Sequence, residues 1–299
     1  MRRSFMVVLA LALAFGVQAQ QVKVPKLGKR LTSRQVVEYL AADALQGRNG
    51  GTEGDTLASE FIYRQLEKLG LEPGMQKFNV KKGNINTFNV YGSVAGRSGK
   101  YIVVGAHYDH LGKKKGLGIH PGADDNASGI VALLSLAKMM KSSGIIPEYT
   151  ILFCAWDGEE KGLLGSKYFV EKWFGTRAAS DSICYYMNFD MVGRTATPEH
   201  PAVTFAWNDN YPYLKEQCTK VAEMIPGPFR ILYDQRFGDG KGGSDYAPFS
   251  ARNIPFVAWM EDEMHEDYHK PTDTPDKIHW IKLRKTVLLA YGILFGWVN

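Results

Sequence analysis

From about residue 100 to the end of the sequence, apolar runs that read as strands alternate with stretches of helical periodicity. The expected strands cover residues 100–107, 149–156, 182–189 and 254–260, and the expected helices cover residues 127–141, 162–173, 212–224 and 281–298. Alternation of this kind is typical of βαβ units, in which a parallel sheet is covered on both faces. The sequence therefore predicts an α/β fold with three α/β/α layers and a mixed, mostly parallel central sheet.

The preceding part of the chain has a different pattern. Ser33 is a candidate N-cap for a helix that extends to about Leu45, and a second helix is expected at residues 55–69. Strand-like runs follow at residues 75–80 and 85–94, and the short connections between them and residues 100–107 predict an antiparallel start to the sheet. No long linker interrupts these elements, so we expect residues 20–299 to form a single domain.

The first 19 residues have the composition of a secretory signal. Arg2 and Arg3 precede an apolar stretch from Phe5 to Val17, and small residues follow around Ala19. An uncleaved N-terminal anchor is the less favoured alternative, because the apolar stretch is short for a bilayer. We therefore expect residues 1–19 to be a signal peptide and the chain to be exported, either to the periplasm or as a secreted protein.

The charge of the chain is mild. Removing residues 1–19 takes away two arginines and no acids, which lowers the formal net charge from +5 to +3. This value gives no reason to expect a nucleic-acid partner, and the lysines at 113–115 read as a solvated loop. The apolar C-terminal run is short and interrupted, so we expect a buried helix and no membrane span in the mature chain.

The three cysteines do not form a metal-binding pattern. They are Cys154, Cys184 and Cys218, and no CxxC spacing is present. Cys154 and Cys184 lie in apolar runs and are expected to be buried thiols, with one disulfide left open in an exported protein.

Acidic and histidine residues follow the apolar runs at the points where strands are expected to end. The residues so placed are His107, Asp109, Glu159, Glu160, Asp190, His265 and His269, with Asp124 and Asp125 in a loop just before a helix. Ligands of open parallel sheets bind beyond the carboxyl ends of the strands. Any one of these residues alone is more often a turn residue or a helix cap. Asp190 is harder to explain in this way, because its apolar neighbours would bury it and a buried carboxylate needs a partner charge or a metal.

Together these residues predict a metal site. Imidazole and carboxylate ligands without thiolates suit Zn²⁺ in a hydrolytic role. The number of acids exceeds the needs of one structural zinc, and a second ion would account for the excess. Two-metal hydrolases hold their ions about 3.5–4 Å apart.

Five motifs in this order resemble those of the co-catalytic di-zinc exopeptidases, a family that includes bacterial leucyl-type aminopeptidases, glutamate carboxypeptidases and glutaminyl cyclases. The motifs are GAHYDHLG (105–112), GADDNASG (122–129), WDGEEKGLLGS (156–166), NFDMVG (188–193) and YHKPTDTPDKI (268–278). The resemblance covers residues 34–299 and implies a zinc peptidase catalytic domain with two Zn²⁺ ions and peptide substrates.

The resemblance also implies the metal ligands. His107 and Asp190 would bind one zinc, Glu160 and His269 would bind the other, and Asp125 would bridge the two. The family pattern selects Asp125 over its neighbour Asp124, which is left as support for the loop. It likewise selects His269 over His265, and it gives His110 and His120 no direct role.

Two further residues are given catalytic roles by the same resemblance. Asp109 would hold the imidazole of His107 and fix its tautomer. Glu159 would act as the general base, taking a proton from the attacking water and passing it to the leaving amine.

Four functions are compatible with parts of this pattern. The one favoured is an aminopeptidase that removes N-terminal residues from peptides, and the main alternative is a glutaminyl cyclase that uses one zinc to form N-terminal pyroglutamate. A non-catalytic binding domain is disfavoured because every ligand and the base are present. A glycosidase is disfavoured because two adjacent acids at one strand end do not flank a sugar.

Overall fold

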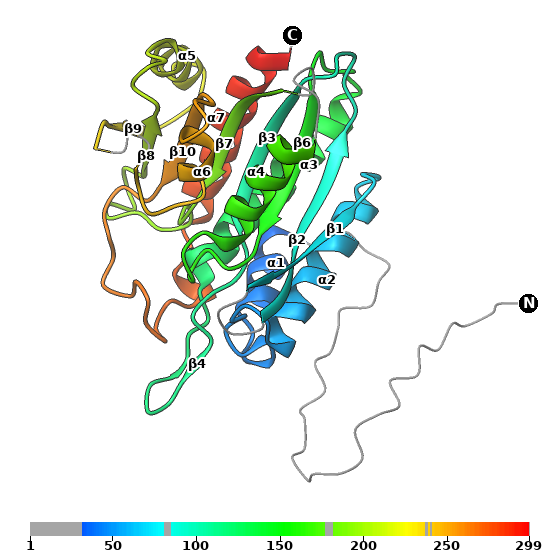
Figure 1. Ribbon diagram of the computed structural model, residues 1–299. Helices are drawn as coiled ribbons and strands as arrows, with labels where there is room; N and C mark the ends of the chain where they lie inside the picture. Colours follow the sequence, from blue (N-terminus) through cyan, green and yellow to red (C-terminus); the bar gives the residue numbers. More distant parts are fainter. Residues whose placement is uncertain (1–31, 81–84, 177–181, 237–238, 240, 299) are drawn as a thin grey trace, which may run out of the picture.

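The computed structural model describes residues 32–80, 85–176, 182–236, 239 and 241–298. The expected signal peptide at residues 1–19 lies outside the described part of the chain, so that expectation stays a prediction. Figure 1 shows a strongly twisted sheet that runs through the molecule, with helices on both faces.

The described residues form an eight-stranded mixed sheet. In spatial order the strands are β1 (Gly74–Val80), β2 (Ile85–Val94), β6 (Thr150–Trp156), β3 (Tyr101–His107), β7 (Ile183–Phe189), β10 (Phe256–Met260), β8 (Ala202–Trp207) and β9 (Arg230–Asp234). Strands β6, β3, β7 and β10 run parallel to their neighbours within this group, whereas β1, β2 and β8 join by antiparallel pairing. The predicted mixed sheet, parallel at its centre, is confirmed.

Side chains of each central strand alternate between two hydrophobic cores. Ile102 and Val104 of β3 belong to one core and Val103 to the other, as expected for a strand that is buried on both faces. The first core packs helices α1 (Ser33–Leu40), α2 (Glu53–Lys68), α3 (Gly129–Ser143), α5 (Tyr213–Ala222) and α7 (Trp280–Val298) on one side of the sheet. The second core packs α4 (Leu164–Thr176) and α6 (Ala247–Ser250) on the opposite side, where α4 lies across the near face of the sheet in Figure 1. The predicted α/β/α layering is therefore confirmed.

The predicted antiparallel start of the sheet is only partly right. Strands β1 and β2 pair antiparallel, but β6 lies between β2 and β3 and pairs with both. The later strand β6 thus separates β2 from β3, which were expected to pair with each other. Strands β8 and β9 were not predicted as strands at all.

The first predicted helix is wrong at both ends. Thr32, rather than Ser33, is the N-cap, because its hydroxyl accepts from the Gln35 N–H while the Gln35 side chain accepts from the Thr32 N–H. The helix ends at Leu40, and a 3₁₀ turn at Asp43–Leu45 replaces its expected last turn. This turn leads into Gln46–Arg48, where left-handed backbone angles turn the chain toward the sheet.

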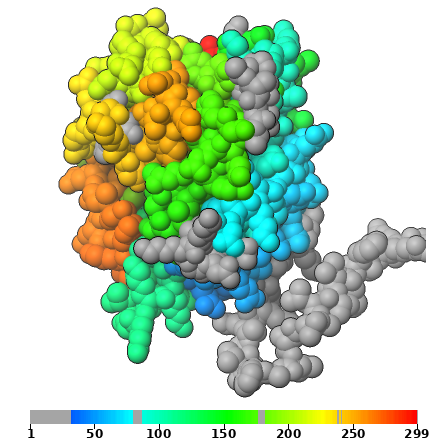
Figure 2. Space-filling model, in the orientation of Figure 1, coloured from blue at the N-terminus to red at the C-terminus, as the bar shows by residue number. Residues whose placement is uncertain are grey.

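A short hairpin extends from the body of the protein. It consists of β4 (Lys113–Lys114) and β5 (Gly118–Ile119), and it forms the protrusion labelled β4 in Figure 1 and visible at the lower edge of Figure 2. The lysines of this hairpin are exposed, as expected for a solvated loop.

Two other expectations concern the cysteines and the membrane. All three cysteines are free thiols; the predicted burial is confirmed for Cys154 and wrong for Cys184, which is half-buried because it lies near the start of β7, and Cys218 is buried as well. Among the helices of the described residues, α7 included, none combines the length and apolar character needed to cross a bilayer.

Candidate metal centre

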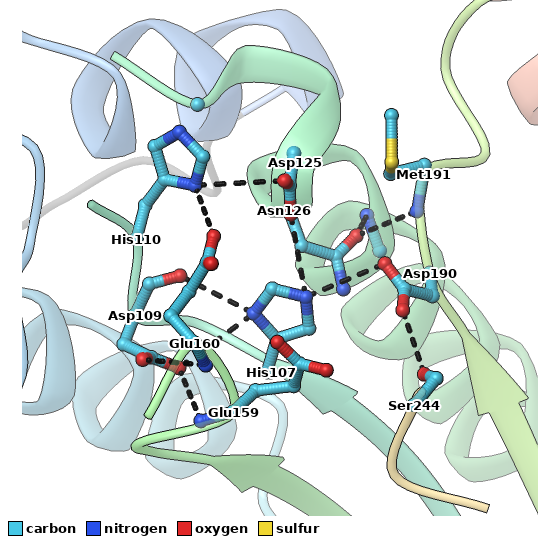
Figure 3. Close-up of polar contacts among 12 residues, drawn as sticks. His107, Asp109, His110, Asp125, Asn126, Glu159, Glu160, Asp190, Met191 and Ser244 are labelled. Atoms are coloured by element: carbon cyan, nitrogen blue, oxygen red, sulfur yellow. Dashed lines mark hydrogen bonds and ion pairs between the residues drawn. The ribbon is translucent and has the colours of Figure 1, made fainter. Parts of the chain in front are cut away.

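The predicted ligands meet at the carboxyl ends of the central strands (Figure 3). His107 is the last residue of β3, Glu160 follows β6, Asp190 follows β7, and His269 lies beyond β10. Asp125 comes from η2 (Ala123–Ser128), an irregular π-helical turn with non-helical angles at Asp125 and Asn126 that leads into α3 and is called the Asp125 loop below. Because these strands are parallel, their ends share one edge of the sheet, and residues more than 160 positions apart become neighbours.

The carboxylate of Asp125 lies between two imidazoles. Its Oδ1 is 3.4 Å from Nε2 of His107, and its Oδ2 is 3.3 Å from Nε2 of His269. Each imidazole has a second carboxylate partner, because His107 Nε2 lies 3.3 Å from Asp190 Oδ1 and His269 Nε2 lies 3.4 Å from Glu160 Oε2. The donors therefore form two triads, His107–Asp125–Asp190 and Glu160–Asp125–His269, which share Asp125.

The spacing of these donors fits zinc. Nitrogen and oxygen ligands placed tetrahedrally at about 2.0–2.1 Å from Zn²⁺ are separated from each other by roughly 3.3–3.4 Å. The four contacts around Asp125 have this separation and are longer than a well-formed N–H···O hydrogen bond. The residues present therefore fit a pair of metal ions held by one bridging carboxylate.

A second histidine, His110, also lies against the centre. Its Nδ1 is 2.7 Å from Oε1 of Glu160, which is a hydrogen-bond distance, and 3.7 Å from Oδ2 of Asp125. Burial lowers the pKa of His110 to about 3, so the imidazole is neutral, and against an ionised Glu160 it is the tautomer with hydrogen on Nδ1 that donates. His110 thus orients the Glu160 carboxylate by a hydrogen bond. The distance from Glu160 to His269, by contrast, is the one expected for two ligands of the same metal ion. No role for His110 is predicted from the sequence, although the motif GAHYDHLG contains it.

Asp109 is fully buried beneath the centre and binds several groups. Its carboxylate oxygens accept from the main-chain N–H groups of Glu159 (3.0 Å) and Glu160 (3.3 Å). Its main-chain carbonyl lies 3.2 Å from Nδ1 of His107, whereas its Oδ1 lies 3.6 Å from the same nitrogen. Asp109 therefore connects the end of β3 to the turn after β6, and the carbonyl is the nearer partner of His107.

Glu159 stands at the side of His107 with its carboxylate free of polar contacts among the residues drawn in Figure 3. Burial raises its pKa to about 10, with Asp190, Asp245 and Asp109 adding to the rise and His107 opposing it. Positive charge brought to the centre would lower this pKa toward neutrality, the range that suits a general base.

His107 and Asp190 favour each other's charged forms. Burial lowers the pKa of His107, but Glu159 and Asp190 outweigh it and raise the pKa well above its usual value. Burial likewise raises the pKa of Asp190, and His107 together with the Ser244 hydroxyl brings it below its usual value. Ser244 Oγ donates to Asp190 Oδ2 at 2.6 Å, a contact that the sequence analysis did not foresee.

A buried arginine fixes the loops around the centre. Arg48 has no exposed surface, and its guanidinium donates to the carbonyls of Leu40, Tyr108, Pro121 and Gly122. Burial lowers its pKa to about 10, so it keeps its charge at neutral pH. These bonds join the end of β3 to the loop that carries Asp125.

Two further polar side chains hold the Asp125 loop. The carboxylate of Asp273 accepts from the N–H groups of Asp124 and Asp125 at 3.0–3.1 Å. The Asn126 amide donates to the Phe189 carbonyl and accepts from the N–H of Met191. Asp273 lies within the motif YHKPTDTPDKI, so the motif marks it as a candidate functional residue. The sequence alone does not show that its carboxylate binds the Asp125 loop.

The backbone beside the centre adopts unusual conformations. Met191 and His269 have φ values of 55° and 56°, in the left-handed region that non-glycine residues rarely adopt. The cost of such conformations is of order 1–3 kcal/mol each, and they concentrate at functional sites.

A cavity of about 520 Å³ opens onto the centre. His107, Asp125, Glu159, Asp190 and His269 line its floor. Its walls come from the segment after β10 and from the β8–β9 edge of the sheet. Its size is in the usual range for a site that takes a small substrate or one end of a peptide.

A histidine and carboxylate centre at this edge of an α/β sheet is the arrangement expected of a metal-dependent hydrolase. The chain belongs to peptidase family M28, whose family model matches residues 89–293.

Known relatives agree with this assignment. The chain is 28% identical over 217 residues to leupeptin-inactivating enzyme 1 of Streptomyces exfoliatus, covering 72% of this chain and 45% of that protein. It spans about half the length of the curated relatives that it matches.

Solved structures share the fold. BSAP, a zinc aminopeptidase from Bacillus subtilis, superposes with a TM-score of 0.72 at 17% identity and covers 89% of this chain and 94% of its own. A glutaminyl cyclase from Bacteroides thetaiotaomicron gives 0.67 at 18% identity, covering 88% and 96%. At these identities the likeness concerns the fold, which both kinds of enzyme have in common.

Proposed function

We propose that the chain is a zinc-dependent aminopeptidase that hydrolyses N-terminal residues from peptides at a two-metal site. The observation that carries the proposal is the Asp125 carboxylate, which lies between the His107–Asp190 and the Glu160–His269 pairs at zinc-ligand spacing. A single-metal enzyme does not need both pairs. Membership of peptidase family M28 and the names of the curated relatives support the same activity.

In this proposal the metals, when bound, supply Lewis-acid polarisation of the peptide carbonyl and acidify water at the site. Glu159 has the role of general base: its carboxylate takes the proton of the attacking water and returns it to the departing amine. Asp109 orients Glu159 and Glu160 through their main-chain N–H groups, so that one glutamate faces the metals and its neighbour remains free for the proton.

The rival function is a single-zinc glutaminyl cyclase on the same fold. The two are distinguished by assaying the purified, zinc-loaded chain for hydrolysis of aminoacyl-anilides and for cyclisation of peptides with N-terminal glutamine, with zinc measured on the same sample. We expect hydrolysis and at least two zinc ions per chain. Cyclisation without hydrolysis, together with a single zinc, would replace the proposal by its rival.

We also propose that the chain is exported and that residues 20–299 form one catalytic domain. The basic and apolar pattern of residues 1–19 supports export. Mass spectrometry of the protein from its natural host should find a mature N-terminus at or near residue 20; a chain retaining residues 1–19 would contradict it.

A further inference from the structure

A third cluster of metal-binding side chains lies beside the centre described above and supplies none of its proposed ligands, although Glu261 lines the wall of the same cavity. It consists of Asp124, Glu261 and His265, which come from the Asp125 loop, the end of β10 and the turn that follows. His265 Nε2 lies 3.3 Å from Oδ2 of Asp124 and 3.4 Å from Oε2 of Glu261. These separations equal those in the two triads that share Asp125.

The polar atoms of this cluster are buried and without hydrogen-bond partners among the described residues. Asp124 has no exposed surface, and Glu261 is 8% exposed. Five of these atoms make no hydrogen bond: Oδ2 of Asp124, both carboxylate oxygens of Glu261 and both ring nitrogens of His265. Leaving a buried charged group unsatisfied costs free energy, so such a set of atoms indicates a missing partner.

Asp124 is held so that one oxygen faces the cluster. Its Oδ1 accepts from the Gly193 N–H at 2.6 Å, and its main-chain carbonyl accepts from the Ser128 hydroxyl. This leaves Oδ2 directed to His265. The sequence analysis gave Asp124 only a supporting role in its loop and set His265 aside; the structure brings the two together.

The nearest fixed cation does not satisfy the cluster. Lys282 is fully buried, and burial lowers its pKa while Asp124 and Glu261 oppose the fall, but its Nζ donates to the Arg194 carbonyl. Within the part of the chain that is described, it makes no ion pair with either carboxylate. The alternative to a metal ion is a proton, either on Glu261, whose pKa burial and Asp124 raise to about 9, or on His265, which would then pair with both carboxylates.

We propose that Asp124, Glu261 and His265 bind a third divalent transition-metal ion, separate from the pair at Asp125. One imidazole and two carboxylates are the donor types of the other two triads, so zinc is the ion expected, with water completing the coordination. The ion joins the loop that carries Asp125 to the segment that carries His269. It therefore holds in place ligands of the main centre without contributing to it.

The test is the metal content of the full chain after loading with Zn²⁺ and removal of free ion. We expect His265→Ala to bind one zinc fewer than the wild type, as measured by inductively coupled plasma mass spectrometry. His200→Ala is the matched control, because this histidine is exposed and should leave the metal content unchanged. Glu261→Gln preserves shape and volume, and it should also lose one ion.

Equal zinc content in wild type, His265→Ala and Glu261→Gln would overturn the proposal. Anomalous scattering at the zinc edge from crystals of the wild-type protein gives a readout that does not depend on the folding of any variant. A peak between Asp124, Glu261 and His265 supports the site, and its absence rejects it. Neither measurement uses activity, so the result stands apart from the aminopeptidase proposal.

Discussion

The centre of the sheet and its edges contribute differently to this molecule. Strands β6, β3, β7 and β10 run parallel, and their carboxyl ends bring His107, Glu159, Glu160 and Asp190 to one place. The β1–β2 edge carries none of the candidate ligands. The β8–β9 edge reaches the cavity only as wall, through residues such as Thr204.

The difference follows from strand direction. Parallel strands place every carboxyl end on the same side, so polar residues distant in sequence converge there, whereas β2, β8 and β9 run in the opposite direction and their carboxyl ends lie on the other side. The centre thus accumulates buried carboxylates that need cations, and the edges are stabilised by ordinary packing. Substitutions at the centre should therefore change catalysis, and substitutions at the edges should change the free energy of unfolding.

The largest effect is expected at the centre, from Glu159→Gln. The amide cannot accept the proton, so kcat should fall by a factor on the order of 10²–10⁴ while zinc content and thermal stability stay near wild type. Steady-state kinetics on an aminoacyl-anilide, with zinc analysis, measures this.

Glu263→Gln is the matched control for that change. Glu263 is exposed at the cavity wall, so the same exchange of carboxylate for amide should leave kcat nearly unchanged. Full activity in Glu159→Gln would remove Glu159 from its role as base.

At the β1 edge, Phe78→Ala should show the opposite pattern. Phe78 is buried and its ring stacks on Tyr168 of α4 with centroids 5.3 Å apart. Loss of a buried phenylalanine costs about 3 kcal/mol or more in unfolding free energy, measurable by urea denaturation. The control is Met75→Ala on the same strand, where the side chain is 37% exposed and the loss should be small. A fall in kcat at temperatures well below melting would show that the edge is coupled to the centre.

The same contrast explains how much of the fold could be predicted. The central strands are continuous apolar runs, buried on both faces, and their limits were predicted within two residues. Strand order was not, because the insertion of β6 between β2 and β3 depends on contacts between distant segments. Strand β9 is mostly exposed and has no clear period, while β8 is wholly buried but short, and no element was predicted for either segment.

The candidate site divides similarly. The candidate ligands could be named because all of them lie in motifs, four of them at or beyond the end of a strand and Asp125 just before α3. The partners that orient them could not, because the bonds from Ser244 to Asp190 and from His110 to Glu160 join residues 50 or more positions apart. A single sequence shows that these residue types are present, but it does not show that they lie close together in the fold.

A smaller effect is expected from Asp109→Asn, beneath the centre. The Glu159 and Glu160 N–H groups bind different oxygens of Asp109, and asparagine replaces one of these oxygens by an NH2 donor, so one of the two bonds is lost. Groups that orient metal ligands typically change metal affinity or activity 10–100-fold, and we expect about this loss in zinc affinity. Competition with a chromogenic chelator measures it, and exposed Asp239→Asn is the control. Unchanged zinc affinity in a folded Asp109→Asn protein would show that main-chain contacts alone hold the ligands.

The smallest effect concerns the pH dependence of stability near the β2 edge, where Asp55 of α2 accepts from the Thr87 hydroxyl of β2. Burial raises the pKa of Asp55 to about 7, so the folded protein holds a proton that the unfolded chain releases near pH 4. The stability contributed by this proton is fully present below about pH 4 and is lost as pH rises toward 7.

Asp55→Asn mimics the protonated carboxyl and should make the melting temperature less dependent on pH across this window. Because Asp55 shares its environment with the buried Asp157, we expect a change on the order of 1 kcal/mol, or roughly 2–4 °C. Melting curves between pH 4 and 7, recorded for the metal-free protein, exclude the contribution of bound metal ions. Parallel pH profiles for wild type and variant would mean that Asp55 is ionised in the folded protein.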